Sequence, residues 1–170
     1  MILIGIGSNL AYSPAATPRE TAAAAVASFP AIGVRLIALS NWYASEPVPA
    51  SDQQWFVNAV ATVACSVGPE ALLGQLLRLE TRFGRVRGEA NAARTLDLDL
   101  LDYDSRRLDT AKLILPHPRL HQRRFVLEPL CEIAPDWRHP RLGLNIAELI
   151  DLLPPGQPVT RLEGRARRPT

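Results

Sequence analysis

The chain has 170 residues, of which 47% are hydrophobic and 21% are charged, and its formal net charge at pH 7 is +2. This length fits one domain with a hydrophobic core, and the charged fraction is too low for a disordered polymer. The small net charge argues against a protein that coats nucleic acid electrostatically, because such domains carry a large basic excess.

The first part of the chain predicts a strand, a helix and two more strands. The apolar run from Ile2 to Ile6 predicts a buried strand. Thr17-Pro18-Arg19-Glu20 is a helix-start signature, with Thr17 as N-cap and Glu20 completing a capping box, and the alanines carry this helix to Ala27. Val34 to Leu39 predicts a second strand, residues 41–54 are loop-like, and Trp55 to Val67 predicts a third strand.

The second part predicts a helix and a strand, followed by C-terminal additions. Pro69-Glu70 opens a helix with leucines at helical spacing, and Gly84 ends it. Beyond an arginine-bearing loop, Thr95 to Tyr103 predicts a strand. The additions are a short strand at 113–115, a helix over 124–131 interrupted at Pro129, and a helix over 146–153.

This element order predicts the α+β class, specifically a ferredoxin-like βαββαβ sandwich with helices on one face of a sheet. We expect a single domain over residues 1–160 and a basic, flexible tail over 161–170. Cys65 and Cys131 are too few and too isolated for a disulfide framework or a zinc site. No stretch reaches the roughly 18–20 apolar residues of a membrane span, and the first residues lack a basic leader, so we expect a cytoplasmic protein without a membrane partner.

The sharpest chemical feature is the segment RTLDLDLL, residues 94–101. Side chains alternate along a strand, so its leucines point to one face while Asp97 and Asp99 point to the other, with Cα atoms about 6–7 Å apart. Two carboxylates this close repel each other unless a cation lies beside them, and such hard oxygen ligands suit Mg²⁺. The alternative is an edge strand with a solvated acidic face.

Arginines surround this strand in the sequence, and Lys112 is the only lysine of the chain. A basic loop beside paired aspartates suits a nucleotide polyphosphate with its magnesium, which both sets of charges can bind. The alternative is a solvated, charge-balanced loop. Glu80 is either an ordinary surface residue or a contact to a ribose or base. The arginines upstream of the aspartates are Arg82, Arg85, Arg87 and Arg94.

Phe56 and Asn58 share one face of the third strand, where a ring and an amide could stack on and hydrogen-bond a flat heterocycle. The alternative is a core phenylalanine and a sheet-end cap. His117 lies between two prolines, and a second set of possible anion ligands follows it: Arg119, Arg123 and Arg124.

The motifs GIGSNL, SEPV, QQWFVNAV, LETRFGRVR, RTLDLDLL, LPHPRL and RRFVLEPLCEIAP, in this order, resemble those of the hydroxymethyldihydropterin pyrophosphokinases. The resemblance extends from Ile2 to Pro135. It implies a ferredoxin-like enzyme in which the hydroxymethyl oxygen of a dihydropterin attacks the β-phosphorus of ATP and AMP leaves. We also expect a monomer that acts on small molecules and binds no nucleic acid.

The resemblance further implies a role for each matching residue. Asp97 and Asp99 would hold two Mg²⁺ ions and, with Arg85 and Arg94, form the catalytic group. The ATP-binding residues would be Glu80, Arg87, His117 and Arg123. The pterin-binding residues would be Ser45, Val48, Phe56, Asn58 and Phe125.

The sequence departs from the family pattern in three places. The loop from Glu89 to Ala93 lacks the usual tryptophan and arginine and is one residue shorter, Glu46 replaces a proline, and Phe56 replaces a tyrosine. These changes favour a slower enzyme or one that acts on a modified pterin alcohol. Two alternatives stay open: a weakly active paralogue, and an RNA-binding module of the same element order. The RNA-binding alternative leaves Asp97 and Asp99 without a role.

Overall fold

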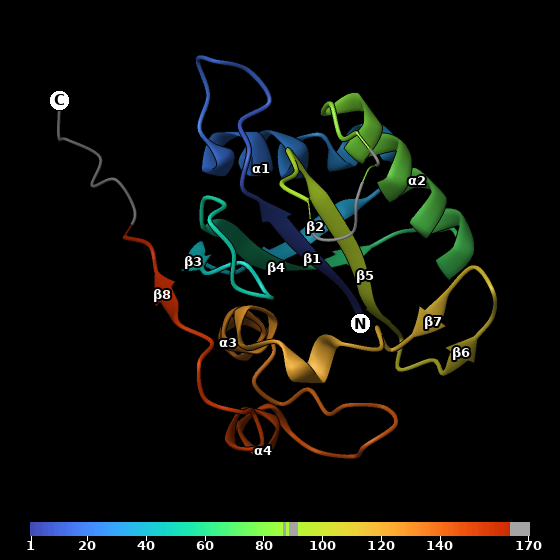
Figure 1. Cartoon of the computed structure of the whole chain (residues 1–170). Helices are drawn as coiled ribbons and strands as arrows, with labels where there is room; N and C mark the ends of the chain where they lie inside the picture. The colour runs from blue at the N-terminus through green and yellow to red at the C-terminus, as the bar shows by residue number, and fades with distance from the viewer. Residues whose placement is uncertain (87, 89–91, 164–170) are drawn as a thin grey trace, which may run out of the picture.

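The computed structural model describes residues 1–86, 88 and 92–163, and Figure 1 shows a sheet between two layers of helices. The elements in chain order are β1 (Ile2–Ser8), α1 (Pro18–Ala27), η1 (Phe29–Ile32), β2 (Arg35–Leu39), β3 (Tyr43–Ser45), β4 (Phe56–Ala64), α2 (Pro69–Arg82), β5 (Asp97–Tyr103), β6 (Leu108–Asp109), β7 (Ile114–Leu115), η2 (Leu120–Gln122), α3 (Arg124–Ile133), α4 (Ile146–Asp151) and β8 (Val159–Arg161). Within the described ranges, no helix combines the length and apolar character needed to cross a membrane.

The main sheet is antiparallel, with strand order β5-β1-β4-β3-β8 and with β2 also paired to β4. β2 and β3 lie along the same side of β4 and act as one interrupted strand. Ser40 occupies the interruption, where its backbone N–H donates to the Val60 carbonyl and its hydroxyl accepts from the Val60 N–H. With β2 and β3 taken together, this is the ferredoxin-like arrangement, so the predicted fold class is confirmed.

One face of the sheet is covered by α1 and α2, which lie above it in Figure 1. α1 begins with the predicted capping box, in which Thr17 and Glu20 each satisfy a backbone N–H of the other. α2 ends before Gly84, whose positive φ of 75° suits the residue after a helix. The core on this face combines the alternate residues of β1 and β4 with leucines of α2 and β5: Ile2, Ile4, Ile6, Ala59, Ala61, Val63, Leu72, Leu76, Leu79, Leu98 and Leu100.

The other face is only partly covered, by α3 and α4, which lie below the sheet in Figure 1. These helices belong to the C-terminal additions. The prediction of helices on one face of the sheet did not say where these additions would pack. They pack on Leu3, Val60 and Leu101 to form a second core with Leu127 and Leu130. The rest of this face, beside the C-terminal end of β1 and the N-terminal end of β4, borders a cavity.

Three local expectations were wrong. Residues 41–54 contain β3, and Arg161, expected in the tail, is the last residue of β8; these two strands pair with each other. Neither is long enough to show a periodic pattern in the sequence. α3 continues through Pro129 to Ile133 because the apolar residues around this proline are buried in the second core, which offsets one lost helical hydrogen bond.

Candidate active site

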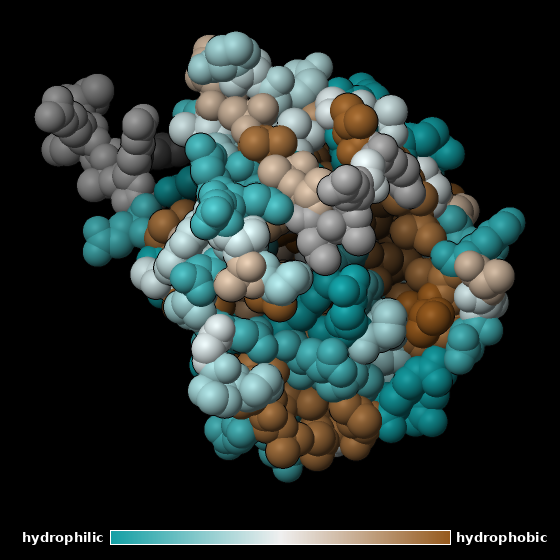
Figure 2. Space-filling view, viewed as in Figure 1, coloured by the Kyte–Doolittle hydropathy of each residue, from teal (hydrophilic) through white to brown (hydrophobic). Residues whose placement is uncertain are grey.

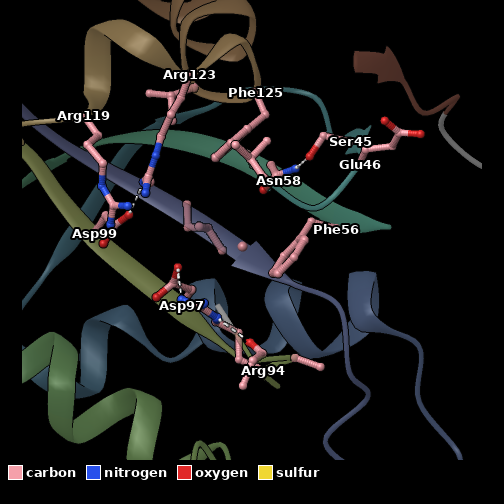
Figure 3. A pocket seen from close by; sticks show the side chains of 18 of the residues that line it. Ser45, Glu46, Phe56, Asn58, Arg94, Asp97, Asp99, Arg119, Arg123 and Phe125 are labelled. Carbon is pink, nitrogen blue, oxygen red and sulfur yellow. Dashed lines mark hydrogen bonds and ion pairs between the residues drawn. The ribbon is translucent and has the colours of Figure 1, made fainter. Parts of the chain in front are cut away.

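A cavity of about 540 Å³ lies on the half of the sheet face that α3 leaves open. Figure 2 shows the molecule hollowed near its centre, with hydrophilic residues along the hollow. Figure 3 shows Asp97, Asp99 and the arginines toward one end, and Phe56, Asn58 and Phe125 toward the other, where Ser45 and Glu46 also lie. A volume of this size is typical of small-molecule sites.

The floor of the cavity is backbone rather than side chain because β1 carries two glycines there. A Cβ atom at Gly7 would lie 3.3 Å from Oδ1 of Asn58 and 3.8 Å from Cβ of Asp97. Gly5 pairs with Asp99 and Gly7 with Asp97 across the β1–β5 ladder. A larger residue at Gly7 would therefore fill the space between the charged and the aromatic end.

The charged end is built around the two aspartates of β5. Asp97 and Asp99 both face the cavity, as the strand alternation predicts, whereas the leucines between and beside them are in the first core. Asp97 forms ion pairs with Arg85 and with Arg94, the second at 3.1 Å. Asp99 pairs with Arg123 at 3.2 Å, and Nε2 of His117 lies 3.9 Å from its other oxygen.

The buried Glu80 hydrogen-bonds two groups at the charged end of the cavity. Its Oε1 accepts the backbone N–H of Leu98 and a guanidinium N–H of Arg85, both at 2.7 Å, while Oε2 is buried without a hydrogen-bond partner. Burial is the main reason why the pKa of Glu80 rises to about 7, against the opposing effects of the Leu98 hydrogen bond and the Arg85 charge. Glu80 therefore fixes both Arg85 and the strand that carries the aspartates.

The two aspartates have the chemistry of a magnesium site completed by a substrate. Burial, and then the charge of Asp97, raise the pKa of Asp99, while His117 and Arg123 act in the opposite direction. A divalent cation beside these carboxylates would relieve their mutual repulsion. The described residues contain no cluster of three or more His, Cys, Asp or Glu side chains for an all-protein cage. Mg²⁺ is typically held by one or two carboxylates with waters and substrate phosphates, so the residues fit this ion.

The aromatic end combines residues from three elements. Phe56 and Asn58 share a face of β4, as predicted, and Phe125 at the start of α3 lies across the cavity from Phe56 in Figure 3. Asn58 is buried and its Nδ2 donates to Oγ of Ser45 at 2.8 Å. Val48 lines the same end. Two phenylalanines with an oriented amide between them can stack on and hydrogen-bond a flat heterocycle.

The structure brings most of the predicted residues into this cavity. Glu80 and His117 do not line it but contact residues that do. Arg87 and residues 89–91 of the short loop lie outside the described residues. Gln122, which sequence reasoning did not single out, also lines the cavity, as do Arg119, one of the possible anion ligands, and the two floor glycines, whose residue type is typical of close backbone approach. The predicted residues that line the cavity are Ser45, Val48, Phe56, Asn58, Arg85, Arg94, Asp97, Asp99, Arg123 and Phe125.

Comparison with known proteins identifies the same family. Residues 3–135 match the family model of 7,8-dihydro-6-hydroxymethylpterin-pyrophosphokinase. The 2-amino-4-hydroxy-6-hydroxymethyldihydropteridine pyrophosphokinase of Pseudomonas aeruginosa is 40% identical over 154 residues, which cover 90% of this chain and 91% of the relative. The Synechocystis enzyme of that name is 40% identical over 149 residues, 88% of this chain and 74% of the relative. The chain therefore belongs to the 7,8-dihydro-6-hydroxymethylpterin-pyrophosphokinase family.

Proposed function

We propose that this protein transfers pyrophosphate from Mg-ATP to the hydroxymethyl group of 6-hydroxymethyl-7,8-dihydropterin and releases AMP, a step of folate biosynthesis. The observation that carries the proposal is the division of one cavity into a charged and an aromatic end, in a chain of this family. A triphosphate and a flat heterocycle need these two environments, and the floor of β1 glycines lets the substrates approach each other. The relatives named above are pyrophosphokinases, which supports the same reaction here.

At the charged end, Asp97 and Asp99 would hold magnesium, two ions in our proposal. Bound magnesium would neutralise phosphate charge and orient the triphosphate. Arg85, Arg94 and Arg123, which now pair with the aspartates, would turn their guanidinium forks to the phosphate oxygens. Arg87 and His117 would assist them at the phosphate tail. Glu80 would support the nucleotide side by holding Arg85 in place.

At the aromatic end, Phe56 and Phe125 would enclose the pterin ring. Because Nδ2 of Asn58 donates to Ser45, its Oδ1 is oriented as an acceptor for the N–H groups of the ring edge. Ser45 and the backbone around Val48 would complete the hydrogen bonds to that edge. A ring held on both faces and along one edge has little freedom, so its hydroxymethyl group would point to the phosphates.

Catalysis would then depend on position and charge. The hydroxymethyl oxygen forms a bond to the β-phosphorus, the bond from that phosphorus to the α,β-bridging oxygen breaks, and AMP leaves. The hydroxyl proton is released in the same reaction. Holding the two substrates in line converts an encounter in solution into a step within one complex, which lowers the barrier by several kcal/mol.

We also propose the remaining properties that the sequence predicts. The protein would act as a cytoplasmic monomer on small molecules, with a single domain that includes β8 and no nucleic-acid partner. The missing tryptophan and arginine between Glu89 and Ala93 favour slower turnover, or turnover of a modified pterin alcohol. A turnover number normal for the family with the unmodified pterin would contradict that second proposal.

The direct test is the identity of the nucleotide product. Incubation with ATP, Mg²⁺ and 6-hydroxymethyl-7,8-dihydropterin should produce AMP, and chelation of the metal should stop the reaction. ADP in place of AMP would contradict pyrophosphate transfer. A gel-shift titration with single-stranded RNA should show no complex, whereas tight RNA binding would favour the alternative binding module.

A further inference from the structure

The C-terminal segment, residues 156–161, forms an outer wall at the aromatic end of the cavity. Within it, β8 pairs with β3, and Val159 lies opposite Ser45 in that ladder. A second, smaller cavity of about 90 Å³ separates Pro158 and Val159 from Val48 and Phe125. The segment lies beyond Pro135, where the family match ends. The segment therefore contacts residues of the aromatic end, although it lies outside the match to the family model.

Gln157 joins this segment to the start of α3 with both ends of its amide. Its Oε1 accepts the backbone N–H of Arg124 at 2.9 Å, and its Nε2 donates to the carbonyl of Gln122 at 3.0 Å. These two backbone groups flank Arg123, the N-cap residue of α3. Arg123 makes no side-chain capping bond itself. Gln157 thus supplies an acceptor that a first-turn N–H of a helix needs and fixes the backbone on both sides of one residue.

Arg123 and its near neighbour Phe125 carry side chains from this helix start to the charged and the aromatic end of the cavity. Arg123 reaches Asp99 at 3.2 Å, and its guanidinium carbon lies 5.5 Å from the centroid of the Phe125 ring. Figure 3 shows these two side chains descending from the start of α3 toward the cavity. A shift of this helix start would therefore move a phosphate-facing cation and a stacking ring together.

We propose that Gln157 is a positioning residue for the pterin-binding end: it holds the first turn of α3 so that Phe125 faces Phe56 across the ring. The inference rests on the proposed function, since it assigns the aromatic end to the pterin. Gln157 acts through the backbone and does not line the main cavity. The sequence alone could not indicate it, because its partners are 33 and 35 residues away in the chain.

The test compares substrate constants of Gln157→Ala with those of the wild-type protein. Loss of two hydrogen bonds at one helix start should raise KM for the pterin about tenfold. KM for ATP should rise clearly less than KM for the pterin, because of the proposed phosphate ligands only Arg123 lies at this helix start, whereas Arg85 and Arg94 come from other segments of the chain. Gln157→Glu keeps the acceptor for Arg124 and places a negative charge at the N-terminus of α3, so it should recover most of the pterin affinity.

Thr160→Ala, on the exposed part of β8, is the matched control and should leave both constants unchanged. An unchanged pterin KM in Gln157→Ala would overturn the proposal. So would equal rises in both KM values with no recovery in Gln157→Glu, which would indicate general loosening. If the wild-type protein formed no AMP, the proposed function would fail. The same variants, compared for the pterin Kd by calorimetry, would then decide the role of Gln157 in the same way.

Discussion

At the charged end of the cavity, the two aspartates come from a single strand, with Arg94 three residues before the first of them. At the aromatic end, Ser45, Asn58 and Phe125 come from β3, β4 and α3, and the outer wall comes from the C-terminal segment. The first arrangement follows from strand alternation alone, whereas the second exists only after the chain has folded. Under the proposed function, the metal ligands are therefore encoded locally in this protein, whereas the pterin pocket and the placement of Arg85 and Arg123 depend on tertiary structure.

The two ends also differ in their electrostatic cost. Burial raises the pKa values of Glu80 and Asp99 at the charged end, so ionising these groups opposes folding. The aromatic end has two half-buried rings and one amide–hydroxyl hydrogen bond. We infer that the charged end is where the protein gives up stability for function, and that the aromatic end contributes to both.

The largest expected effect is at Asp97. Asp97→Asn keeps the shape of the side chain but removes the charge, which leaves Asp99 as the one carboxylate of the proposed metal-binding pair. Turnover should fall by at least about a hundredfold, because metal-assisted stabilisation of phosphate charge is worth several kcal/mol. AMP release measures it, with Asp109→Asn on β6 as the control for removing an exposed carboxylate. Full activity of Asp97→Asn would remove the basis for the metal site.

A second effect is the pH dependence of stability, which we expect at the charged end because of Glu80. The pKa of Glu80 is raised from 4.5 to about 7, so the stability linked to its proton is present below pH 4.5 and is lost as the pH rises through 7. The free energy of unfolding of the wild-type protein, relative to Glu80→Gln, should fall by roughly 3 kcal/mol over this range.

Urea unfolding at several pH values tests the Glu80 prediction. Glu70→Gln, at the exposed start of the same helix, is the matched control for removing a carboxylate from α2. A constant difference between the wild-type protein and Glu80→Gln from pH 4 to 8 would show that folding does not raise the pKa of Glu80. The cost of the charged end would then be smaller than we infer.

The smallest of these effects is at Phe56. Phe56→Ala should weaken pterin binding about tenfold, since an aromatic stacking partner is worth up to about 1.5 kcal/mol. ATP binding should be nearly unaffected. Calorimetric titrations with each substrate measure both, and Trp55→Ala is the control, because Trp55 is exposed and does not line the cavity. If both substrates were weakened equally by Phe56→Ala, the separation into two ends would be wrong.

The sequence predicted the parts of the molecule whose signals are local. The capping box of Thr17 and Glu20, the alternation around Asp97 and Asp99, and the shared face of Phe56 and Asn58 each need only a few consecutive residues. β3 and β8 were missed, and α3 and α4 were predicted as helices but not placed on the second face of the sheet, because short strands and long-range packing leave no periodic pattern. Glu80 could be noted in the sequence but not placed, since its buried contact with Leu98 depends on the packing of α2 against β5.

The most direct test of the account follows the β-phosphorus of ATP. With ATP labelled with ³²P at the β position, Mg²⁺ and the pterin alcohol, the label should appear in the pterin product and be absent from the released nucleotide. Both ends of the cavity must hold their substrates in line for this bond to form. Label that stays with the nucleotide, as ADP, would contradict the account.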